Sequence, residues 1–464
     1  MGAGGLQEKV TELAEKFDVT GASVGVTIGG VEHYAFHGVT SIDNPLPVDD
    51  ATLFQFGSTG KTYTATAMLR LAEEGKVDLD APVRDYVPEL KLQDEDVAAK
   101  VTVLQLFNHT AGWEGDMMDN TGDGDDALEK YVARMERLQQ VTPLGATVSY
   151  NNASLCLAGR LIEKVTGTTY EQAIRDLLLT PIGLDHTFFF PNEIMTRRFA
   201  VGHTGHEDGT VTIARPWALP RSGAPAGGMS ATARDQIAWA QFHLGDGTGK
   251  DGVRVLSQES LDRMKQPTAD MRGSALGDYV GISWLIRDVD GVRLVGHGGT
   301  TNGQHSEFVM VPERDFAIIS MTNIGPNGPQ FNTELEKWAL EHFVGVVDAE
   351  PEQLALGDEA LQIYVGRYET IAASVDITAE QGRLMAKVEI KPEMKAILRE
   401  SGEDVDEEQP PVPLALLAGD GDKYVVPDGP AKGMKGYFSR GADGQVDGVH
   451  LGGRLATKVA TVPA

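Results

Sequence analysis

The chain reads Phe54-Gln55-Phe56-Gly57-Ser58-Thr59-Gly60-Lys61 where an extended, aromatic run gives way to a helical stretch from Thr62 to Glu74. This change of pattern predicts Ser58 on the first turn of a helix and Lys61 one turn further along. Residues three apart on a helix share a face, so the lysine amine can reach the serine hydroxyl. The helix N-terminus also favours negative charge developing at that hydroxyl. The stretch therefore predicts a nucleophile with its own base.

A Ser-x-x-Lys tetrad is weak evidence by itself, because average composition produces roughly one or two of them by chance in a chain this long. Two later triplets strengthen it. Tyr150-Asn151-Asn152 follows a turn signal and precedes an apolar-periodic run from Leu155 to Val165. His297-Gly298-Gly299 lies between an apolar stretch and a strand-like segment from Ser306 to Val311. Three separated stretches therefore carry candidate site residues.

Histidine-x-glycine selects no site by itself, since it recurs at His203, His243 and His450. Only His297 has strand-like sequence on both sides, with glycines that let a backbone pass close to a ligand. We expect His203 and His243 to be surface or core histidines. We expect His109 to be a structural, hydrogen-bonded histidine in a loop before Gly112.

In chain order, Ser-x-x-Lys, Tyr-x-Asn and a basic residue-x-Gly resemble the three site motifs of the serine β-lactamase and penicillin-binding-protein superfamily. The closest resemblance is to its class C branch of esterases, D-aminopeptidases and DD-peptidases. It covers roughly the first three-quarters of the chain. It implies an α+β fold, an antiparallel sheet flanked by helices with a helical lobe, and an active site in the groove between them. Further stretches resemble this branch in its order: Phe107 to Gly112, Tyr150 to Gly167, Pro181 to Leu184 and Gly227 to Ala233.

From the residues and this resemblance we expect Ser58 to attack an ester or amide carbonyl and to form an acyl-enzyme. Lys61 and Tyr150 would share the proton transfers. Each has a reference pKa of about 10 and is a poor base while protonated. An adjacent ammonium favours tyrosinate and a buried site favours neutral amine, so each group would make the other usable near neutral pH.

The remaining motif residues would position the substrate. Asn152 would hold Lys61 and orient the acyl-side amide of the substrate, while His297 would hydrogen-bond the catalytic tyrosine or the leaving group. By the resemblance, the backbone N–H groups of Ser58 and of Thr300, next to Gly299, would form the oxyanion hole. We expect no metal and no cofactor.

Three classes of function remain open. A serine hydrolase acting on small esters, amides or short peptides is preferred. A DD-peptidase or β-lactamase acting on D-Ala-D-Ala-type peptides or β-lactams uses the same chemistry, and a non-catalytic penicillin-binding-type sensor is the third reading. Many family members carry Lys where His297 stands. A neutral imidazole is a weaker partner for a substrate carboxylate than an ammonium, which favours the first class over the second.

Composition limits the partners and the location. The 464 residues carry 40 basic and 68 acidic side chains, a net charge of −28, which argues against nucleic acid and anionic membranes as partners. Cys156 is the only cysteine, which excludes an intrachain disulfide and a multi-thiolate metal site, and we expect it in the core. No apolar run is long enough to span a bilayer. The stretch Met1 to Glu8 lacks a signal-peptide pattern, so we expect a cytoplasmic protein, or a periplasmic or secreted one if a leader was removed.

Strands at both ends of the first part of the chain, with helices between them, indicate one antiparallel sheet built from chain-distant pieces. We expect a hydrolase domain over residues 1–347. Its expected elements are a helix at 6–17, a hairpin of 21–28 with 31–38, strands at 280–287, 292–296, 305–311 and 316–322, and a closing helix around 331–343. The acidic, Gly-rich stretch 114–126 is either a flap over the cleft or a simple surface loop.

The composition changes after residue 347. Residues 348–363 are expected to form a linker, and 364–464 show short alternating segments divided by Gly, Pro and Asp turns. This pattern predicts a small all-β domain, a sandwich or a barrel. In the family such appended domains are often lipocalin-like, and they either cover the cleft or support homo-oligomers. The sequence does not choose between these roles.

Overall fold

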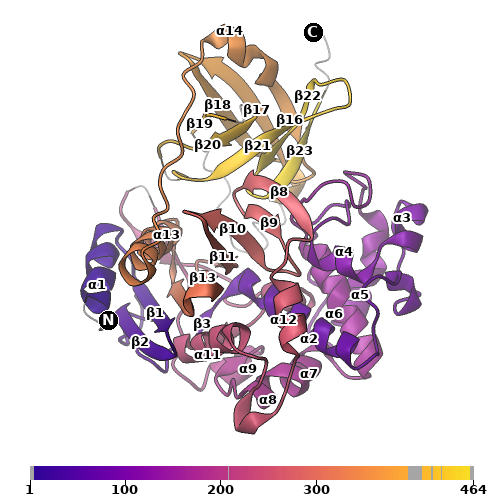
Figure 1. The fold of residues 1–464 in the computed structure, drawn as a ribbon, viewed down its shortest axis with the longest axis vertical. Coiled ribbons are helices and arrows are strands. Elements are labelled where there is room, and N and C mark those ends of the chain that lie inside the picture. Colours follow the sequence, from indigo (N-terminus) through magenta and orange to yellow (C-terminus); the bar gives the residue numbers. More distant parts are fainter. Residues whose placement is uncertain (1–4, 207, 396–409, 420–421, 430, 460–464) are drawn as a thin grey trace. The chain divides into compact units, whose positions relative to one another are not determined.

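The computed structural model describes residues 5–206, 208–395, 410–419, 422–429 and 431–459 (Figure 1). The chain divides into two compact units, each built from separate stretches of sequence. The first unit contains Met1–Ala146, Asn151–Thr268 and Val280–Asp348, and the second contains Thr147–Tyr150, Ala269–Tyr279 and Ala349–Ala464.

An antiparallel sheet forms the centre of the first unit. The predicted hairpin is present and turns at Gly29 and Gly30, which both have the positive φ that tight hairpin turns require. Its first strand also pairs with a strand near residue 320, so segments almost 300 residues apart in sequence lie side by side. The strand order is β2 (Val31–Gly38), β1 (Gly21–Ile28), β14 (Phe316–Thr322), β13 (His305–Val311), β11 (Val292–Gly296) and β10 (Leu285–Val289), with β12 (Gly299–Thr300) paired to β13.

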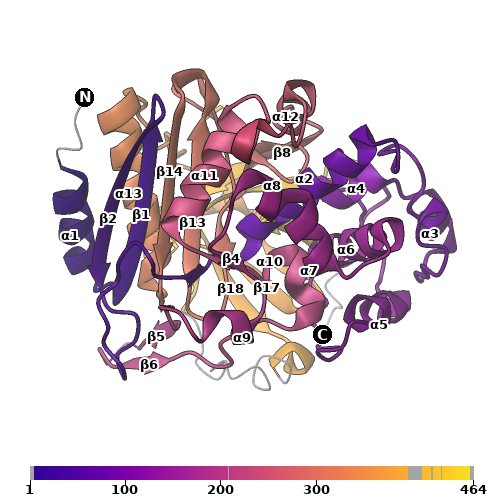
Figure 2. The same cartoon turned by 90° about the horizontal axis from the view of Figure 1, so that it is seen from below.

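Helices cover both faces of this sheet (Figure 2). On one face, α1 (Leu6–Lys16) and α13 (Asn327–Ala339) bury Val10 and Leu335 in an apolar layer. On the other, α11 (Ala233–Leu244) packs against β1 and β14 and buries Trp239. The helix expected at 6–17 and the strands expected at 292–296, 305–311 and 316–322 are confirmed.

A helical lobe completes the first unit. Its central helix, α2 (Gly60–Glu73), is buried on almost all sides, as a core helix should be. Buried threonine hydroxyls on α2 donate to carbonyls, as Thr62 and Thr66 do to the carbonyls of Thr59 and Thr62. The other helices of the unit are α3 (Glu95–Lys100), α4 (Val103–Phe107), α5 (Ala127–Arg134), α6 (Asn152–Thr166), α7 (Tyr170–Ile174), α8 (Thr180–Ile182), α9 (Pro191–Ile194), α10 (Ala224–Gly227) and α12 (Gln258–Met264).

Two small sheets join short segments, and of these only the run that begins at Phe54 was expected to be extended. The first has the order β3-β7-β4 and begins just before Ser58; the second has the order β15-β5-β6. Their strands are only two or three residues long, too short for a sequence period to reveal. The bounds are β3 (Phe54–Gln55), β7 (Ser230–Ala231), β4 (Thr187–Phe188), β15 (Ile324–Gly325), β5 (His203–Gly205) and β6 (Val211–Ile213).

One predicted strand, 280–287, is wrong. The chain leaves the extended conformation after Val280 and resumes it only at Leu285. Between them, Ile282 donates its N–H to Met264 at 2.9 Å and Ser283, with φ of 59°, donates to Phe107 at 3.0 Å. These tertiary hydrogen bonds replace the strand ladder. The closing helix begins at Asn327, earlier than expected, and its last turn widens into a π-helix over Leu340–Val344.

The second unit contains a closed barrel, so the barrel alternative is confirmed for the C-terminal all-β domain. Neighbouring strands follow one another in the chain, the up-and-down order typical of lipocalin-like barrels. Tyr368 and Tyr424 lie in its apolar core and donate their hydroxyls to backbone carbonyls. The strands are β16 (Gly366–Glu369), β17 (Ala373–Glu380), β18 (Arg383–Ile390), β19 (Val412–Leu416), β20 (Lys423–Val425), β21 (Lys435–Arg440), β22 (Val446–Leu451) and β23 (Arg454–Lys458).

Other segments of the second unit accompany the barrel. The short helix α14 (Asp358–Leu361) and the following 3₁₀ turn bring Leu361 and Tyr364 into the barrel core. Strand β8 (Ala269–Ser274) contacts β21, and β9 (Gly277–Val280) follows it. Across the described ranges of the whole chain, every helix is too short or too polar to cross a membrane.

Candidate active site

Ser58 and Lys61 lie together, as the tetrad predicts. Lys61 Nζ donates to Ser58 Oγ at 2.9 Å and to the carbonyl of Ala226, on α10, at 2.6 Å. Ser58 lies in a 3₁₀ turn, Gly57–Thr59, that leads into α2, rather than on the first turn of the α-helix itself. The lysine side chain is fully buried. An amine removed from water and fixed beside a hydroxyl is the arrangement that nucleophilic catalysis requires.

The Ser58 turn packs directly against the strand that follows His297. Gly57 has φ of 52°, and a Cβ there would come within 2.6 Å of Thr300 N. A Cβ at Gly299 would come within 1.9 Å of the Phe56 carbonyl oxygen. Both positions therefore need glycine, one for its conformation and close approach, the other for close approach alone. The two glycines bring the predicted nucleophile and the predicted oxyanion segment together.

Hydrogen bonds fix this contact. Thr59 Oγ1 donates to the carbonyl of His297 at 2.9 Å, and Ser306 Oγ donates to the Phe56 carbonyl at 2.8 Å. The first of these bonds joins residues separated by 238 positions in the chain. The motifs at Ser58 and His297 are thus parts of one structure, even though they are remote in sequence.

His297 is buried, with 3% of its surface exposed. Burial and the nearby positive charge of Lys61 lower the pKa of His297 to about 3, so the ring is neutral at pH 7. Its Nδ1 lies 2.5 Å from the Gly298 carbonyl oxygen. Because a carbonyl only accepts, we assign the ring proton to Nδ1, which leaves Nε2 as an acceptor. The buried position of His297 near Lys61 therefore agrees with the neutral imidazole that we expect there.

Asn152 is the first residue of α6, and the preceding Asn151 caps the helix by accepting from Ser154 N at 2.9 Å. Asn152 and Cys156 are one turn apart and share a helix face. Burial raises the pKa of the Cys156 thiol to about 12, and the positive charge of Lys61 opposes this rise. That face of α6 is therefore directed toward the lysine. Cys156 is buried, as expected.

Asp116 is a further candidate site residue, one that the sequence analysis did not predict. Asn152 Nδ2 donates to Asp116 Oδ1 at 3.0 Å. Asp116 belongs to the acidic stretch 114–126, whose sequence allows either a flap or a surface loop and gives no register against Asn152. In the structure this stretch is anchored: Tyr131 donates its hydroxyl to the Met117 carbonyl, and Ser222 donates to the Asp119 carbonyl.

Tyr150 belongs to the second compact unit, together with the barrel residues it contacts. Its N–H donates to the Gly453 carbonyl at 2.9 Å, and the Arg454 guanidinium lies 5.1 Å from the centre of its ring. No sequence pattern pointed to Gly453 or Arg454. The partnership of Tyr150 with Lys61 stays a prediction.

His109, His203 and His243 make structural contacts, as expected. His109, with φ of 60°, accepts from Asn151 N at 3.2 Å and so supports the start of α6. His203 is buried and bonds to Ile42 N and to the Asn323 carbonyl. His243 is buried beside the rings of Trp239 and Trp284.

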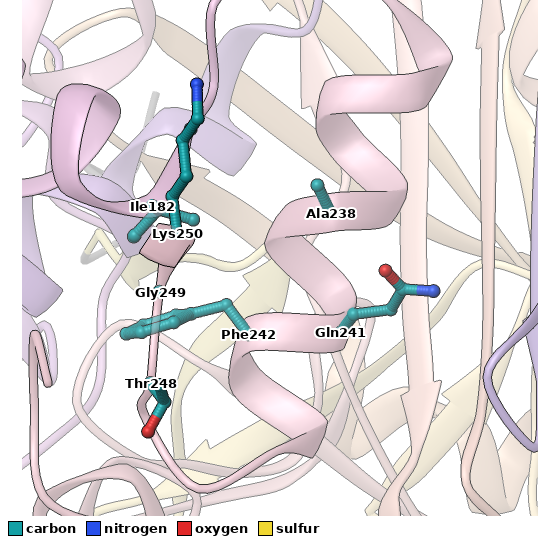
Figure 3. A pocket seen from close by; sticks show the side chains of 8 residues that line it. Ile182, Ala238, Gln241, Phe242, Thr248, Gly249 and Lys250 are labelled. Atoms are coloured by element: carbon teal, nitrogen blue, oxygen red, sulfur yellow. The ribbon is translucent and has the colours of Figure 1, made fainter. Parts of the chain in front are cut away.

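A surface pocket of about 460 Å³ lies against α11, where Phe242 extends toward the segment that carries Lys250 (Figure 3). None of its lining residues belongs to the predicted site. The described ranges contain no group of three or more His, Cys, Asp or Glu side chains arranged to hold a metal ion.

Comparison with known proteins agrees with the fold and with the family resemblance. The family model described as Beta-lactamase matches residues 6–342. Penicillin-binding protein 4 of Amycolatopsis lactamdurans is 35% identical over 343 residues, which are 73% of this chain and 90% of that protein. The crystal structure of SurE is 24% identical, covers 98% of both chains and gives a TM-score of 0.76. D-amino acid amidase from Ochrobactrum anthropi SV3, complexed with L-phenylalanine amide, is 25% identical, covers 71% of this chain and 95% of that one, and gives a TM-score of 0.59.

The sheet, the helical lobe and the Ser58–Lys61 pair define a protein of the serine β-lactamase and penicillin-binding-protein type. With the match over residues 6–342, the chain belongs to the β-lactamase family. The matched range spans every residue named for the site by the three motifs.

Proposed function

We propose that this protein is a serine hydrolase that cleaves small esters or amides through an acyl-enzyme at Ser58. One observation carries the proposal: the fully buried Lys61 amine lies 2.9 Å from the Ser58 hydroxyl. Burial and the coupling to Tyr150 would let the Lys61 amine give up its charge, and a neutral amine at this distance can accept the hydroxyl proton. Membership of the β-lactamase family supports the same chemistry.

The reaction has two halves. Ser58 Oγ forms a bond to the substrate carbonyl carbon while its proton passes to the pair of Lys61 and Tyr150. That proton then goes to the leaving alcohol or amine as its bond to the carbonyl carbon breaks. In the second half a water gives its proton to the same pair and attacks the ester carbon, and the bond to Ser58 Oγ breaks as the serine regains a proton.

The other site residues would stabilise the tetrahedral intermediates and orient the substrate. The close packing of Gly57 on Thr300 supports an oxyanion hole made of the backbone N–H groups of Ser58 and Thr300, which would stabilise the negative charge of each tetrahedral intermediate. Asn152 would position the acyl group. The neutral His297, with Nε2 as an acceptor, would hydrogen-bond Tyr150 or the leaving group.

A DD-peptidase or β-lactamase activity is the alternative, because the same acyl-enzyme chemistry serves it. The similarity to penicillin-binding protein 4 of Amycolatopsis lactamdurans favours it. The neutral His297 argues against it, because β-lactams and the D-Ala-D-Ala terminus carry a carboxylate that an ammonium binds better. The similarity to a D-amino acid amidase favours the amide-cleaving form of the first proposal.

An activated phosphonate tests the nucleophile. It should add its mass to the tryptic peptide of residues 17–61, which carries Ser58 and ends at Lys61. Ser58→Ala should lose both the label and nearly all turnover while keeping the thermal unfolding of the wild type. Labelling of another peptide, or full turnover by Ser58→Ala, would overturn the proposal, and absence of both label and turnover in the wild type would favour the non-catalytic reading.

A further inference from the structure

The acidic segment 115–125 is fixed at two places. The N–H group of Asn152, on the first turn of α6, donates to the Gly115 carbonyl at 3.1 Å. Further along the segment, the Asp119 carbonyl accepts from Ser222 Oγ at 2.7 Å. Ser222 lies in the 3₁₀ turn that leads into α10. The segment therefore connects the start of α6 with the start of α10.

Helix α10 is a fixed neighbour of Lys61. Its Ala226 carbonyl accepts from Lys61 Nζ at 2.6 Å. A Cβ at Gly159 of α6 would come within 2.2 Å of Pro225, so α6 packs closely against α10. Thr64 Oγ1, on α2, also donates to the Pro225 carbonyl at 2.7 Å. Since α10 is held by two longer helices, a larger group bound beside Lys61 would displace the acidic segment before it displaced α10.

Arg221 holds the far part of the segment. Its guanidinium binds both carboxylate oxygens of Glu171, on α7, at 2.8 and 3.1 Å. It also donates to the Asp123 carbonyl at 2.7 Å and lies 2.9 Å from Asp125 Oδ1. The Arg221 and Glu171 side chains are 15% and 6% exposed, so the bidentate pair with Glu171 fixes the guanidinium. Arg221 thereby joins the segment to α7.

Apolar burial adds little to this attachment. Residues 122–126 are all exposed, and the Asp125 side chain is 81% exposed. The far part of the segment is therefore held chiefly by its polar bonds to Arg221 and Ser222. Parts of a protein that make few buried apolar contacts open at a lower free energy than the core. Loss of the Arg221 bonds should free this part of the segment while the core stays folded.

Resting on the proposed function, we propose that Arg221 limits the size of the acyl group that the site accepts, because it holds the segment 115–125 in place next to Asn152. The near part of the segment contacts Asn152, the residue expected to orient the acyl group. A short acyl group binds with the segment attached. A long one requires the far part to detach, so its apparent affinity is reduced in proportion to the fraction of molecules in which that part is detached. Arg221 acts through the segment and is a positioning residue.

The first test compares acyl groups on one leaving group. p-Nitrophenyl acetate and p-nitrophenyl hexanoate differ only in the length of the acyl chain. In Arg221→Gln, the ratio of kcat/KM for the hexanoate to that for the acetate should rise by about 10-fold or more, the scale of one lost hydrogen bond to a charged group. The change should appear as a lower KM for the hexanoate, with kcat nearly unchanged. Arg221→Lys keeps the charge but loses the bidentate geometry, and it should give a smaller rise.

Limited proteolysis measures the attachment without turnover. Endoproteinase Asp-N cleaves before aspartate, and the far part of the segment contains Asp123 and Asp125. The cleavage rate follows the population of the opened form when opening and closing are fast. Arg221→Gln should be cleaved in this segment about 10-fold faster than the wild type, or more. Ser222→Ala removes only the bond to the Asp119 carbonyl, so it should show both changes to a smaller extent, and it tests the proposal if Arg221→Gln does not fold.

Arg160 provides the matched control. Its side chain is 13% exposed, against 15% for Arg221, and it pairs with Glu163 at 3.0 Å and with Glu129 at 2.8 Å. These pairs join α6 to α5. Arg160→Gln should therefore lower the melting temperature, but it should leave both the ester ratio and the cleavage rate in the acidic segment at their wild-type values.

Two failures are distinguishable. Absence of phosphonate labelling at Ser58 in the wild type would overturn the proposed function. Normal labelling, with equal losses of kcat/KM for both esters in Arg221→Gln, would overturn the size limit alone, since Arg221 would then only support the fold. An unchanged ester ratio in a folded Arg221→Gln would do the same, whatever the cleavage rate. A cleavage rate equal to that of the wild type would show that Arg221 does not hold the segment.

Discussion

The two faces of strand β13 hold polar side chains of different kinds. Successive residues of a strand point to opposite faces. On one face, Ser306 donates to the Phe56 carbonyl beside the Ser58 turn. On the other, Glu307 lies near Arg287, which pairs with Glu336 of α13. Neighbouring residues of one strand thus belong to the candidate site and to a cluster of charges behind it.

The two faces of β13 are stabilised by different interactions. The site face has mostly neutral hydrogen bonds between chain-distant segments, with a single buried amine at its centre. The back face has an Arg287 guanidinium among carboxylates, including Asp348 at 3.3 Å. We infer that substitutions on the site face change turnover, whereas those on the back face change stability and its pH dependence.

The largest expected effect is on turnover. Lys61→Ala and Tyr150→Phe should each lower kcat by about 100-fold or more, the usual contribution of a positioned acid–base group. If the two form one proton relay, the double variant should lose far less than the product of the single losses. Steady-state kinetics on one p-nitrophenyl ester measures all three variants.

Another buried lysine provides the matched control. Lys265 Nζ donates to the His243 carbonyl at 2.7 Å, away from the residues of the site motifs. Lys265→Ala should lower the melting temperature and leave kcat close to that of the wild type. Strictly additive losses at Lys61 and Tyr150 would contradict a shared relay, and a comparable kcat loss at Lys265 would show that burial, not the site, sets the effect.

A smaller loss of kcat is expected from a substitution at Gly57, where the site face of β13 and the strand after His297 meet the Ser58 turn. Gly57→Ala would place a methyl group 2.6 Å from Thr300 N and disturb the proposed oxyanion hole. Loss of one oxyanion donor typically lowers kcat by roughly 100- to 1,000-fold, so partial displacement should cost at least about 10-fold. The measurement is kcat of the variant at a temperature where it remains folded.

Gly75→Ala is the control that distinguishes the effect of the Gly57–Thr300 contact from the effect of backbone strain. Gly75 has φ of 69°, and a Cβ there would meet nothing within 4 Å. Both substitutions should lose roughly 1–2 kcal/mol of stability from the left-handed conformation, but only Gly57→Ala should lose kcat. Equal kcat in both variants would refute a catalytic contribution from the Gly57–Thr300 contact.

Local patterns in the sequence were sufficient for the elements that depend on near neighbours. The hairpin at Gly29 and Gly30 and the helix that follows Ser58 are examples, because turn chemistry and periodicity act over a few residues. The strand at 280–287 was wrong because hydrogen bonds to Met264 and Phe107 outweigh local preference. The chain gave no signal for these distant partners.

Local sequence likewise does not predict which distant residues contact one another in the candidate site. The three motifs identify residue types, and the Ser58–Lys61 contact follows from helical spacing alone. The bond between Thr59 and His297 and the bond between Asn152 and Asp116 depend on the packing of segments 238 and 36 residues apart, respectively. In the sequence Asp116 is one acidic residue among several in a loop, and only its hydrogen bond with Asn152 distinguishes it.

The back face predicts a pH effect on stability. Burial and the Glu336 carboxylate raise the pKa of Glu307 to about 8, while the Arg287 charge opposes the rise. The folded state therefore keeps a proton that the unfolded chain releases above pH ~4.5. The stabilisation from Glu307 is complete below that pH and is lost as the pH rises to about 8, at no more than about 1.4 kcal/mol per pH unit.

Glu307→Gln removes this titration. Between pH 5 and 8 the melting temperature of the wild type should fall relative to that of Glu307→Gln, by about 2–4 °C for each kcal/mol lost. Glu313→Gln makes the same chemical change at an exposed position and should run parallel to the wild type. A Glu307→Gln curve that stays parallel to the wild type would place the carboxyl outside the charge cluster.

The smallest expected effect concerns the charge at His297. The wild type, with a neutral imidazole, should prefer neutral esters and amides to β-lactams, whose carboxylate favours a nearby ammonium. His297→Lys should raise the relative kcat/KM for a chromogenic cephalosporin against a short p-nitrophenyl ester. The gain should be only a few-fold, because burial and the neighbouring Lys61 charge both disfavour a second ammonium there. It should shrink at high salt, since it is electrostatic, and the neutral His297→Gln should show no gain. A wild type that already hydrolyses the cephalosporin faster than any neutral ester would reverse the preference and place the DD-peptidase and β-lactamase alternative first.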